Sequence, residues 1–189
     1  MIPIETLLDQ CRSGDELAWE ALVRRCQGRV FALAFHYLRD REEARDVAQE
    51  AFIRVYRALP RFDPGGSFHA WLVRITRNIA IDRLRTLHAS PAYDGRRIED
   101  SPAVADDRLD PEHQAVDEAR RALIYRALDR MTEINREMIL LKDIQGLKQR
   151  EIADILAIPI GTVKARTNRA RLELAERILE LEPSYGAVP

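Results

Sequence analysis

The stretch Glu151-Ile-Ala-Asp-Ile-Leu-Ala-Ile-Pro-Ile-Gly-Thr-Val-Lys-Ala-Arg-Thr-Asn-Arg-Ala-Arg171 predicts two short helices joined by a tight turn. Pro159 marks the break, because proline is accepted at the start of a helix but disrupts a helix interior. Apolar and small side chains recur at helical spacing along the second helix, so one of its sides should face inward. This inward stripe consists of Val163, Thr167, Ala170 and Leu174. The pattern indicates a helix-turn-helix.

The opposite side of the second helix is small, polar and basic. No acidic residue occurs between Asp154 and Glu173, so positive charge accumulates along this side. Such a helix fits a DNA major groove, with its N-terminal residues at base edges and its arginines on phosphates. An ordinary helical hairpin with a solvated basic face is the alternative interpretation. The predicted DNA-facing residues are Gly161, Thr162, Lys164, Ala165, Arg166, Asn168, Arg169 and Arg171.

Composition favours a helical protein and limits how firmly it can hold DNA alone. The 189 residues are 46% hydrophobic, which is enough for packed cores, whereas 6% aromatic residues and 8 glycines argue against an all-β design. The net charge is −1, but residues 86–116 carry 3 basic and 7 acidic groups, so the flanking parts are slightly basic. Because phosphate neutralisation supplies most nonspecific DNA affinity, we expect weak DNA binding by the isolated chain and a larger partner that assists it.

Several classes of function are disfavoured by the sequence. Cys11 and Cys26 are too few and too widely spaced for a disulfide framework or a zinc site, so we expect idle or buried thiols and no metal. The histidines are scattered, and Pro64-Gly65-Gly66 lacks the lysine of a phosphate-binding loop, so we expect no enzyme, no cofactor and no small-molecule substrate. We expect neither a signal peptide nor a membrane-spanning segment, because the first residues lack a basic region with an apolar core and no apolar run is long enough. We therefore expect a soluble, cytoplasmic protein without direct membrane insertion.

Helical periodicity divides the chain into two parts. It runs from Ile4 to about His88 without a strand pattern, dissolves in an acidic stretch punctuated by Ser-Pro, Asp-Gly and Asp-Pro pairs, and resumes near Leu123. We predict an all-α protein with two small helical domains, an N-terminal helical bundle and a C-terminal helix-turn-helix, joined by a flexible linker. The predicted ranges are 1–88 for the first domain, 89–116 for the linker, 117–182 for the second domain and 183–189 for a tail.

A second informative segment is Asp46-Val-Ala-Gln-Glu-Ala-Phe-Ile-Arg-Val-Tyr-Arg57, on a helix that Asp40 is placed to cap. Its apolar residues, such as Val47 and Val55, fall on one side of the helix. The other side is polar apart from Ile53. An outward isoleucine among acids and an amide suits a protein contact, although single exposed apolar residues are also common on free surfaces.

Both segments resemble bacterial extracytoplasmic-function RNA polymerase sigma factors, which are members of the sigma-70 family. Gly161-Thr-Val-Lys-Ala-Arg166 and Arg169-Ala-Arg171 are similar to the C-terminal promoter-reading domain of that family. Asp46-Val-Ala-Gln-Glu-Ala-Phe-Ile-Arg-Val55 resembles the region that grips the coiled coil of the largest polymerase subunit. The chain departs from the family pattern at Ala157, usually glycine, and at two outward positions of the second helix that bear on which promoter is read.

The resemblance assigns the polar side of the earlier helix to core RNA polymerase. It covers nearly the whole chain apart from the predicted linker and tail, with both motifs in the order of the family. The polymerase-binding residues that it implies are Asp46, Gln49, Glu50, Ile53 and Arg54.

A third segment, residues 61–85, contains the part that the resemblance assigns to promoter opening. In the family, the helix of this segment and the loop before it recognise the −10 element as a single strand, and the loop holds one flipped base. The matching loop in this chain is 61–67. Phe62 would stack on that base or, alternatively, anchor the loop to the core. Phe68 and Trp71 lie on the apolar side of the helix in this segment, so we expect them in the core. The implied −10 residues are Arg61, Phe62, Asp63, Ser67, Arg74, Arg77 and Asn78.

The resemblance implies a sigma factor that binds core RNA polymerase and directs promoter-specific transcription initiation. The first domain would recognise and melt the −10 element, and the second would recognise the −35 element. A stand-alone helix-turn-helix regulator is the alternative, and it would bind duplex operator DNA alone. The implied partners are core RNA polymerase, promoter DNA and an anti-sigma factor, which would also account for any attachment to the membrane.

Overall fold

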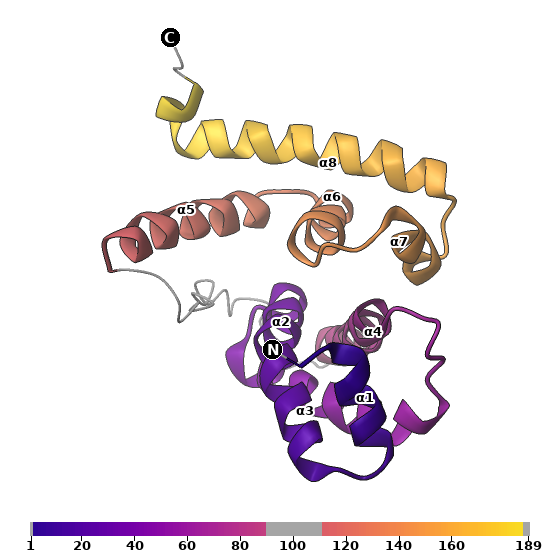
Figure 1. Cartoon of the computed structure of the whole chain (residues 1–189). Coiled ribbons are helices and arrows are strands. Elements are labelled where there is room, and N and C mark those ends of the chain that lie inside the picture. The colour runs from indigo at the N-terminus through magenta and orange to yellow at the C-terminus, as the bar shows by residue number, and fades with distance from the viewer. Residues whose placement is uncertain (1, 90–110, 187–189) are drawn as a thin grey trace. The chain divides into compact units, whose positions relative to one another are not determined.

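The computed structural model describes residues 2–89 and 111–186, and every regular element in these two ranges is helical (Figure 1). The chain divides into two compact units, Met1–Asp100 and Ser101–Pro189. The prediction of an all-α protein is therefore confirmed for the described residues. Most of the predicted linker, and the last three residues of the predicted tail, lie outside the described residues.

The described residues of the N-terminal unit form four α-helices and one 3-10 turn. They are α1 (Ile4–Arg12), α2 (Glu16–Leu38), α3 (Arg41–Ala58), the 3-10 turn η1 (Leu59–Arg61) and α4 (Phe68–Ala89). The helices α2, α3 and α4 pack against one another, and α1 packs on α2 (Figure 1). Their shared core is aliphatic and aromatic, with Leu22, Phe35, Val55 and Leu59 almost fully buried.

Short polar side chains begin three of these helices. Asp15 accepts hydrogen bonds from the N–H groups of Leu17 and Ala18, at 2.9 and 3.1 Å, at the start of α2. Asp40 accepts from the first turn of α3 at 2.9 and 3.0 Å, which confirms the predicted cap. The Ser67 hydroxyl accepts from Ala70 N–H at 3.2 Å at the start of α4. These bonds satisfy helix donors that have no partner within the helix.

The C-terminal unit contains the helix-turn-helix. Its elements are α5 (Pro111–Asp129), α6 (Glu133–Ile139), the π-helical turn η2 (Leu140–Ile144), α7 (Gln149–Leu156), α8 (Ile160–Leu181) and the 3-10 turn η3 (Pro183–Gly186). α8 packs on α5, α6 and α7 (Figure 1). The predicted pair of short helices corresponds to α7 and the start of α8, with Pro159 directly before α8.

Two residues with positive φ end helices in this unit. Gly146 has φ +71° after η2, as a residue without Cβ permits. Ala157 has φ 53° and ψ 45° and closes α7, with its N–H bonded to the carbonyl of Ala153. The left-handed conformation costs an alanine free energy, which gives a physical reason for the glycine usual at this position in the resembled family.

The helix α5 begins at Pro111, which lies inside the range predicted as linker. Proline suits the first turn of a helix, because its fixed φ matches the helix and its missing N–H would have no partner there. The acidic, apolar-poor composition that suggested a linker thus extends into the first turns of a helix. The composition of this segment therefore did not indicate that a helix begins at Pro111.

Candidate nucleic-acid and protein interfaces

The two sides of α3 separate in the structure as its sequence predicts. Val47, Ala51 and Val55 are buried, whereas Asp46, Gln49, Glu50 and Arg54 are exposed on the other side. Ile53 is 42% exposed among them. The structure therefore brings all five predicted polymerase-binding residues onto one accessible surface of α3.

Part of the polar surface of α3 is already internally paired. Arg54 Nη2 lies 2.5 Å from Glu50 Oε1, and both side chains are about half exposed. A pair of this kind contributes little to stability in water, with a typical value of roughly 0.3–0.5 kcal/mol. Its charges are thus available to a partner protein at little cost to the fold.

Arg83 of α4 also borders this surface. Its guanidinium forms a double hydrogen bond to the Glu43 carboxylate of α3, with Nη2 to Oε1 at 2.9 Å. The hydrogen bond to Glu43 raises the pKa of Arg83, with smaller contributions from the carboxylates of Asp46 and Glu50. This arginine was not predicted, because it is 40 residues from Glu43 in the sequence and no local pattern joins them.

An aromatic cluster lies beside the same helix. The ring of Trp19 in α2 contacts Tyr56 edge-on at 5.0 Å between centroids and Phe52 at 6.5 Å. Tyr56 is 59% exposed, only three residues after Ile53. The exposed surface of α3 thus contains an aromatic residue that was not among the predicted contacts, although its spacing of three residues from Ile53 places both on one side of the helix.

The loop between η1 and α4 is anchored by Phe62. The Phe62 ring lies 4.7 Å from Trp71 and 5.8 Å from Phe68 between centroids, and it packs against the core. Of the two roles considered for Phe62, the structure supports the anchoring one. Phe68 is buried and Trp71 is partly buried against the same core, as expected.

The rest of the loop is exposed and held by its own turn. The Asp63 carboxylate accepts from Gly65 N–H at 2.9 Å, and the Asp63 carbonyl accepts from Gly66 N–H at the same distance. A Cβ at Gly66 would lie 3.3 Å from the Asp63 carbonyl oxygen and 3.7 Å from the Phe62 ring. A side chain at this position would therefore press against the backbone of the turn. Arg61 and Ser67 are also exposed, and Ser67 is the cap of α4.

The predicted −10 residues on α4 lie away from its buried stripe. Leu72 and Ile79 face the core, whereas Arg74 and Asn78 are exposed one turn apart and Arg77 is half-buried. A basic side chain and an amide on one accessible face can contact phosphates and a base edge.

The outward side of α8 carries the predicted −35 residues. Val163, Thr167 and Ala170 are buried, as predicted. Most of the opposite residues are exposed, with two of them half-buried. The exposed ones are Gly161, Lys164, Ala165, Asn168, Arg169 and Arg171, and the half-buried ones are Thr162 and Arg166.

Arg171 differs from the other predicted DNA-facing residues. Its guanidinium forms a bidentate ion pair with Asp143 of η2, with Nη2–Oδ1 at 2.5 Å and Nε–Oδ2 at 3.1 Å. This hydrogen bond raises the pKa of Arg171. The side chain therefore joins α8 to η2 in the isolated protein, a contact between residues 28 apart that the sequence did not indicate.

Glu173 holds α8 against the start of α6. Its carboxylate accepts hydrogen bonds from Thr132 N–H at 2.8 Å, from the Thr132 hydroxyl at 3.1 Å and from the Asn135 side-chain amide. Burial acts to raise the pKa of Glu173, but the bonds from Asn135 and Thr132 outweigh it and lower the pKa below its ordinary value. Thr132 is the residue directly before α6. Glu173 therefore caps the N-terminus of α6, although Glu173 itself lies on α8.

Residues 2–89 and 111–186 contain neither a metal-binding cluster nor a membrane-spanning helix. No group of three or more histidine, cysteine or acidic side chains is arranged to hold a metal ion there. Within the same ranges, no helix is both long enough and apolar enough to cross a membrane.

Comparison with known proteins gives matches in both units. Sigma-70 region 2 matches residues 22–89, and Sigma-70, region 4 matches residues 121–174. The ECF RNA polymerase sigma factor SigW of Bacillus subtilis strain 168 is 35% identical over 184 residues, which cover 94% of this chain and 98% of that protein.

Two solved structures are similar over most of the chain. The structure of CnrH in complex with the cytosolic domain of CnrY is 28% identical with a TM-score of 0.64, and the match covers 94% of this chain and 97% of that one. The sigma factor RpoE in complex with the anti-sigma factor NepR from Bartonella quintana is 25% identical with a TM-score of 0.64, covering 86% and 97%.

Proposed function

The chain belongs to the extracytoplasmic-function RNA polymerase sigma factors of the sigma-70 family, and we propose that it contacts core RNA polymerase through α3 and promoter DNA through α4 and α8. As a member of this family it directs promoter-specific transcription initiation and is not an enzyme. The observation that carries the proposal is the presence of both sigma regions in one chain, each with a segregated exposed face. The region 2 match also favours a sigma factor over a stand-alone regulator.

Reconstituted transcription tests this function directly. The purified chain is added to core RNA polymerase with fragmented genomic DNA of the source organism, and transcript starts are mapped. We expect starts that share a −10 and a −35 motif and that core polymerase alone does not produce. An unchanged set of starts in the presence of the chain would contradict the function.

For core polymerase we propose the exposed face of α3, namely Asp46, Gln49, Glu50, Ile53 and Arg54. Glu50→Lys should weaken core binding by about 2 kcal/mol, roughly 30-fold, because it places a like charge beside Arg54 and removes a carboxylate from the contact. Glu20→Lys on α2 is a matched control, since Glu20 forms an equivalent exposed pair with Arg24 at 2.5 Å. Equal affinities of the two variants for core polymerase would show that α3 is not part of the interface.

For promoter DNA we propose two faces. The loop 61–67 and the residues Arg74, Arg77 and Asn78 of α4 would recognise the −10 element as a single strand. Because the Phe62 ring packs on the core, the polar groups and the backbone of the loop would contact the extruded base. The outward residues of α8 would read the −35 element in the major groove.

The −35 assignment has a clear test. Lys164→Ala and Arg169→Ala should reduce promoter binding by holoenzyme while assembly with core polymerase stays unchanged. A base contact would relax the preference at one −35 position by about 1–3 kcal/mol, whereas a phosphate contact would weaken all sequences alike. Arg130→Ala, an exposed arginine outside α8, is the control. Full promoter binding by the double variant of α8 would show that the face is assigned wrongly.

We also propose an anti-sigma factor as the inhibitor of this chain. RpoE of Bartonella quintana, which is similar over most of the chain, was solved with such a partner. An inhibitor that covers faces on both units would bury more than a standard interface of about 1,600 Å². Membrane attachment would then arise only through a membrane-tethered inhibitor. Affinity purification from native cells before induction should recover a stoichiometric small partner, and recovery of the chain only free or with polymerase would exclude this regulation.

A further inference from the structure

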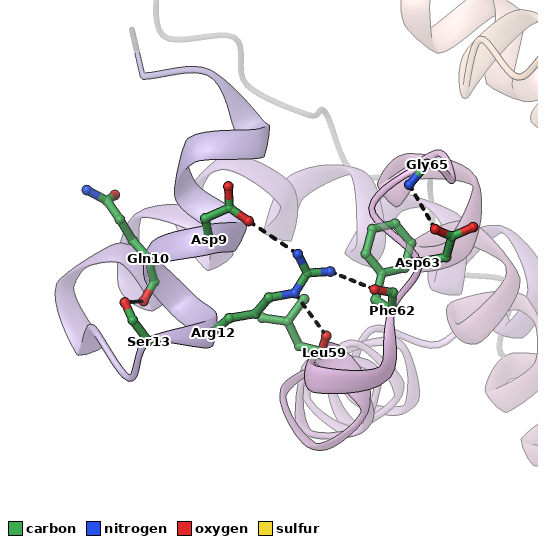
Figure 2. A network of polar contacts seen from close by, with 8 residues as sticks. All are labelled: Asp9, Gln10, Arg12, Ser13, Leu59, Phe62, Asp63 and Gly65. Carbon is green, nitrogen blue, oxygen red and sulfur yellow. Dashed lines mark hydrogen bonds and ion pairs between the residues drawn. The ribbon is translucent and has the colours of Figure 1, made fainter.

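The end of α1 is tied to the loop that precedes α4 by one side chain. Figure 2 shows the Arg12 guanidinium pointing across to η1 and the loop, with Asp9 on its other side. Arg12 Nη2 donates to the Phe62 carbonyl at 2.6 Å, and Nε donates to the Leu59 carbonyl at 3.4 Å. These contacts join residues 50 and 47 positions apart in the sequence.

The guanidinium is held in place from three directions. Asp9 Oδ1 accepts from Nη1 at 3.2 Å, one turn earlier on α1. The carbon of the guanidinium lies 5.8 Å from the centroid of the Phe62 ring, within the range of a cation–π contact. The Arg12 side chain is only 22% exposed. Its bond to the Phe62 carbonyl is therefore charge-assisted and partly shielded from water, which makes it stronger than a surface hydrogen bond.

The bonded carbonyls lie where the path of the loop is decided. Leu59 O also accepts from Phe62 N–H at 3.1 Å and closes the turn of η1. Directly after Phe62, Asp63 and the two glycines form the exposed turn of the loop. Arg12 thus fixes the backbone on one side of this turn, while Ser67 fixes the other side as the cap of α4.

Arginine is specifically suited to this contact. Its planar fork can donate to two carbonyl oxygens and a carboxylate at the same time, and it stays charged at every accessible pH. A lysine could reach a carbonyl, but it would lack the planar fork that spans both. α1 lies before the range matched by Sigma-70 region 2, which begins at residue 22.

We propose that Arg12 is a positioning residue for −10 recognition, setting the loop conformation that discriminates the extruded base. The inference rests on the proposed function of the loop. In this role Arg12 does not touch DNA. It holds the Phe62 backbone so that the groups of the adjacent turn meet the base in one geometry. The N-terminal helix then contributes to promoter choice from outside the recognised sigma regions.

The test compares base preferences of holoenzymes. Holoenzyme is assembled from core polymerase and each full-length variant, and is presented with pre-melted promoters that are randomised at every −10 position. Arg12→Met keeps the length and apolar stem of the side chain and removes all donors. We expect it to lower discrimination at a single −10 position by roughly tenfold, the equivalent of one strong hydrogen bond, with −35 preference and core affinity unchanged. Arg12→Lys should retain part of the discrimination.

Two further variants separate the possible outcomes. Arg24→Met removes an exposed arginine of the same unit that pairs with Glu20 on its own helix, and it should leave the preferences unchanged. Asp63→Ala alters the loop itself. If Asp63→Ala flattens one −10 position and Arg12→Met does not, the positioning role is overturned while the function of the loop stands. If wild type and Asp63→Ala have the same base preferences at every −10 position, the loop does not discriminate the extruded base. The proposed function of the loop then fails.

Loss of folding is distinguished by a second measurement. Both tryptophans, Trp19 and Trp71, lie in the N-terminal unit, so the fluorescence transition in urea reports the stability of this unit. A destabilised but folded variant should lose affinity equally at all −10 positions. Uniform loss for Arg12→Met, with the base profile of wild type, would reduce Arg12 to a purely structural residue and overturn the proposal.

Discussion

Replacing Glu173 by alanine should destabilise the C-terminal unit by about 2 kcal/mol. The substitution removes a carboxylate that accepts hydrogen bonds from the backbone and side chain of Thr132 and from Asn135. A net hydrogen bond to a charged group contributes roughly 1.5–3 kcal/mol where it is shielded, and loss of a helix cap costs about 1 kcal/mol. These two terms sum to about 2.5–4 kcal/mol for shielded groups. Because Glu173 and Asn135 are only half-buried and Thr132 is exposed, the expected value lies below that range.

The assay is urea unfolding of the full-length chain. Tryptophan fluorescence follows the N-terminal unit alone, since both tryptophans lie there, whereas hydrogen exchange of peptides from 119–182 follows the C-terminal unit. We expect faster exchange in these peptides and an unchanged fluorescence transition. Glu176→Ala, an exposed acid on the same helix, is the control. A difference below about 0.5 kcal/mol between the two variants, within the usual range of surface substitutions, would refute the capping role of Glu173.

The pH dependence gives an independent check. Folding lowers the pKa of Glu173, because the hydrogen bonds of Asn135 and Thr132 favour the carboxylate more than burial disfavours it. The contribution of Glu173 is therefore complete above the unfolded pKa of about 4.3 and is lost as pH falls through the lower folded pKa. The stability difference between wild type and Glu173→Ala should be constant near neutral pH and shrink in acid. A difference that grew with falling pH would contradict this assignment.

Three further predictions each concern a single residue. Asp40→Ala should destabilise the N-terminal unit by about 1 kcal/mol, because it removes the cap of α3, and tryptophan fluorescence in urea measures this loss. Ala157→Gly should stabilise the C-terminal unit by about 1 kcal/mol, because the residue has φ 53° and glycine adopts this conformation without strain; slower hydrogen exchange in α7 would confirm it, and faster exchange would contradict it. Arg171→Ala should weaken −35 binding by holoenzyme less than Arg169→Ala does, since Arg171 is already paired with Asp143, and fluorescence anisotropy with labelled promoter DNA compares the two.

The sequence by itself determined most of the helical segments, though not the start of α5 at Pro111, and which sides of α3 and α8 are buried. These properties depend on residues that lie within one or two turns of each other, and the helical period places Val47 with Val55, and Val163 with Ala170, on one side. The cap at Asp40 is equally local, since the side chain bonds the N–H groups two and three residues later. Local geometry alone was enough for these features.

Only the tertiary structure decided how these helices are tied together. Arg12 meets the Phe62 carbonyl across 50 residues, Arg83 meets Glu43 across 40, and Glu173 meets Thr132 across 41. The sequence also left two roles open for Phe62, because a loop aromatic can stack on a base or pack inward. Its contact with Trp71 depends on how the loop folds back onto α4. Such contacts arise from the packing of whole helices against each other, and no local repeat of residue types specifies where two distant turns will meet.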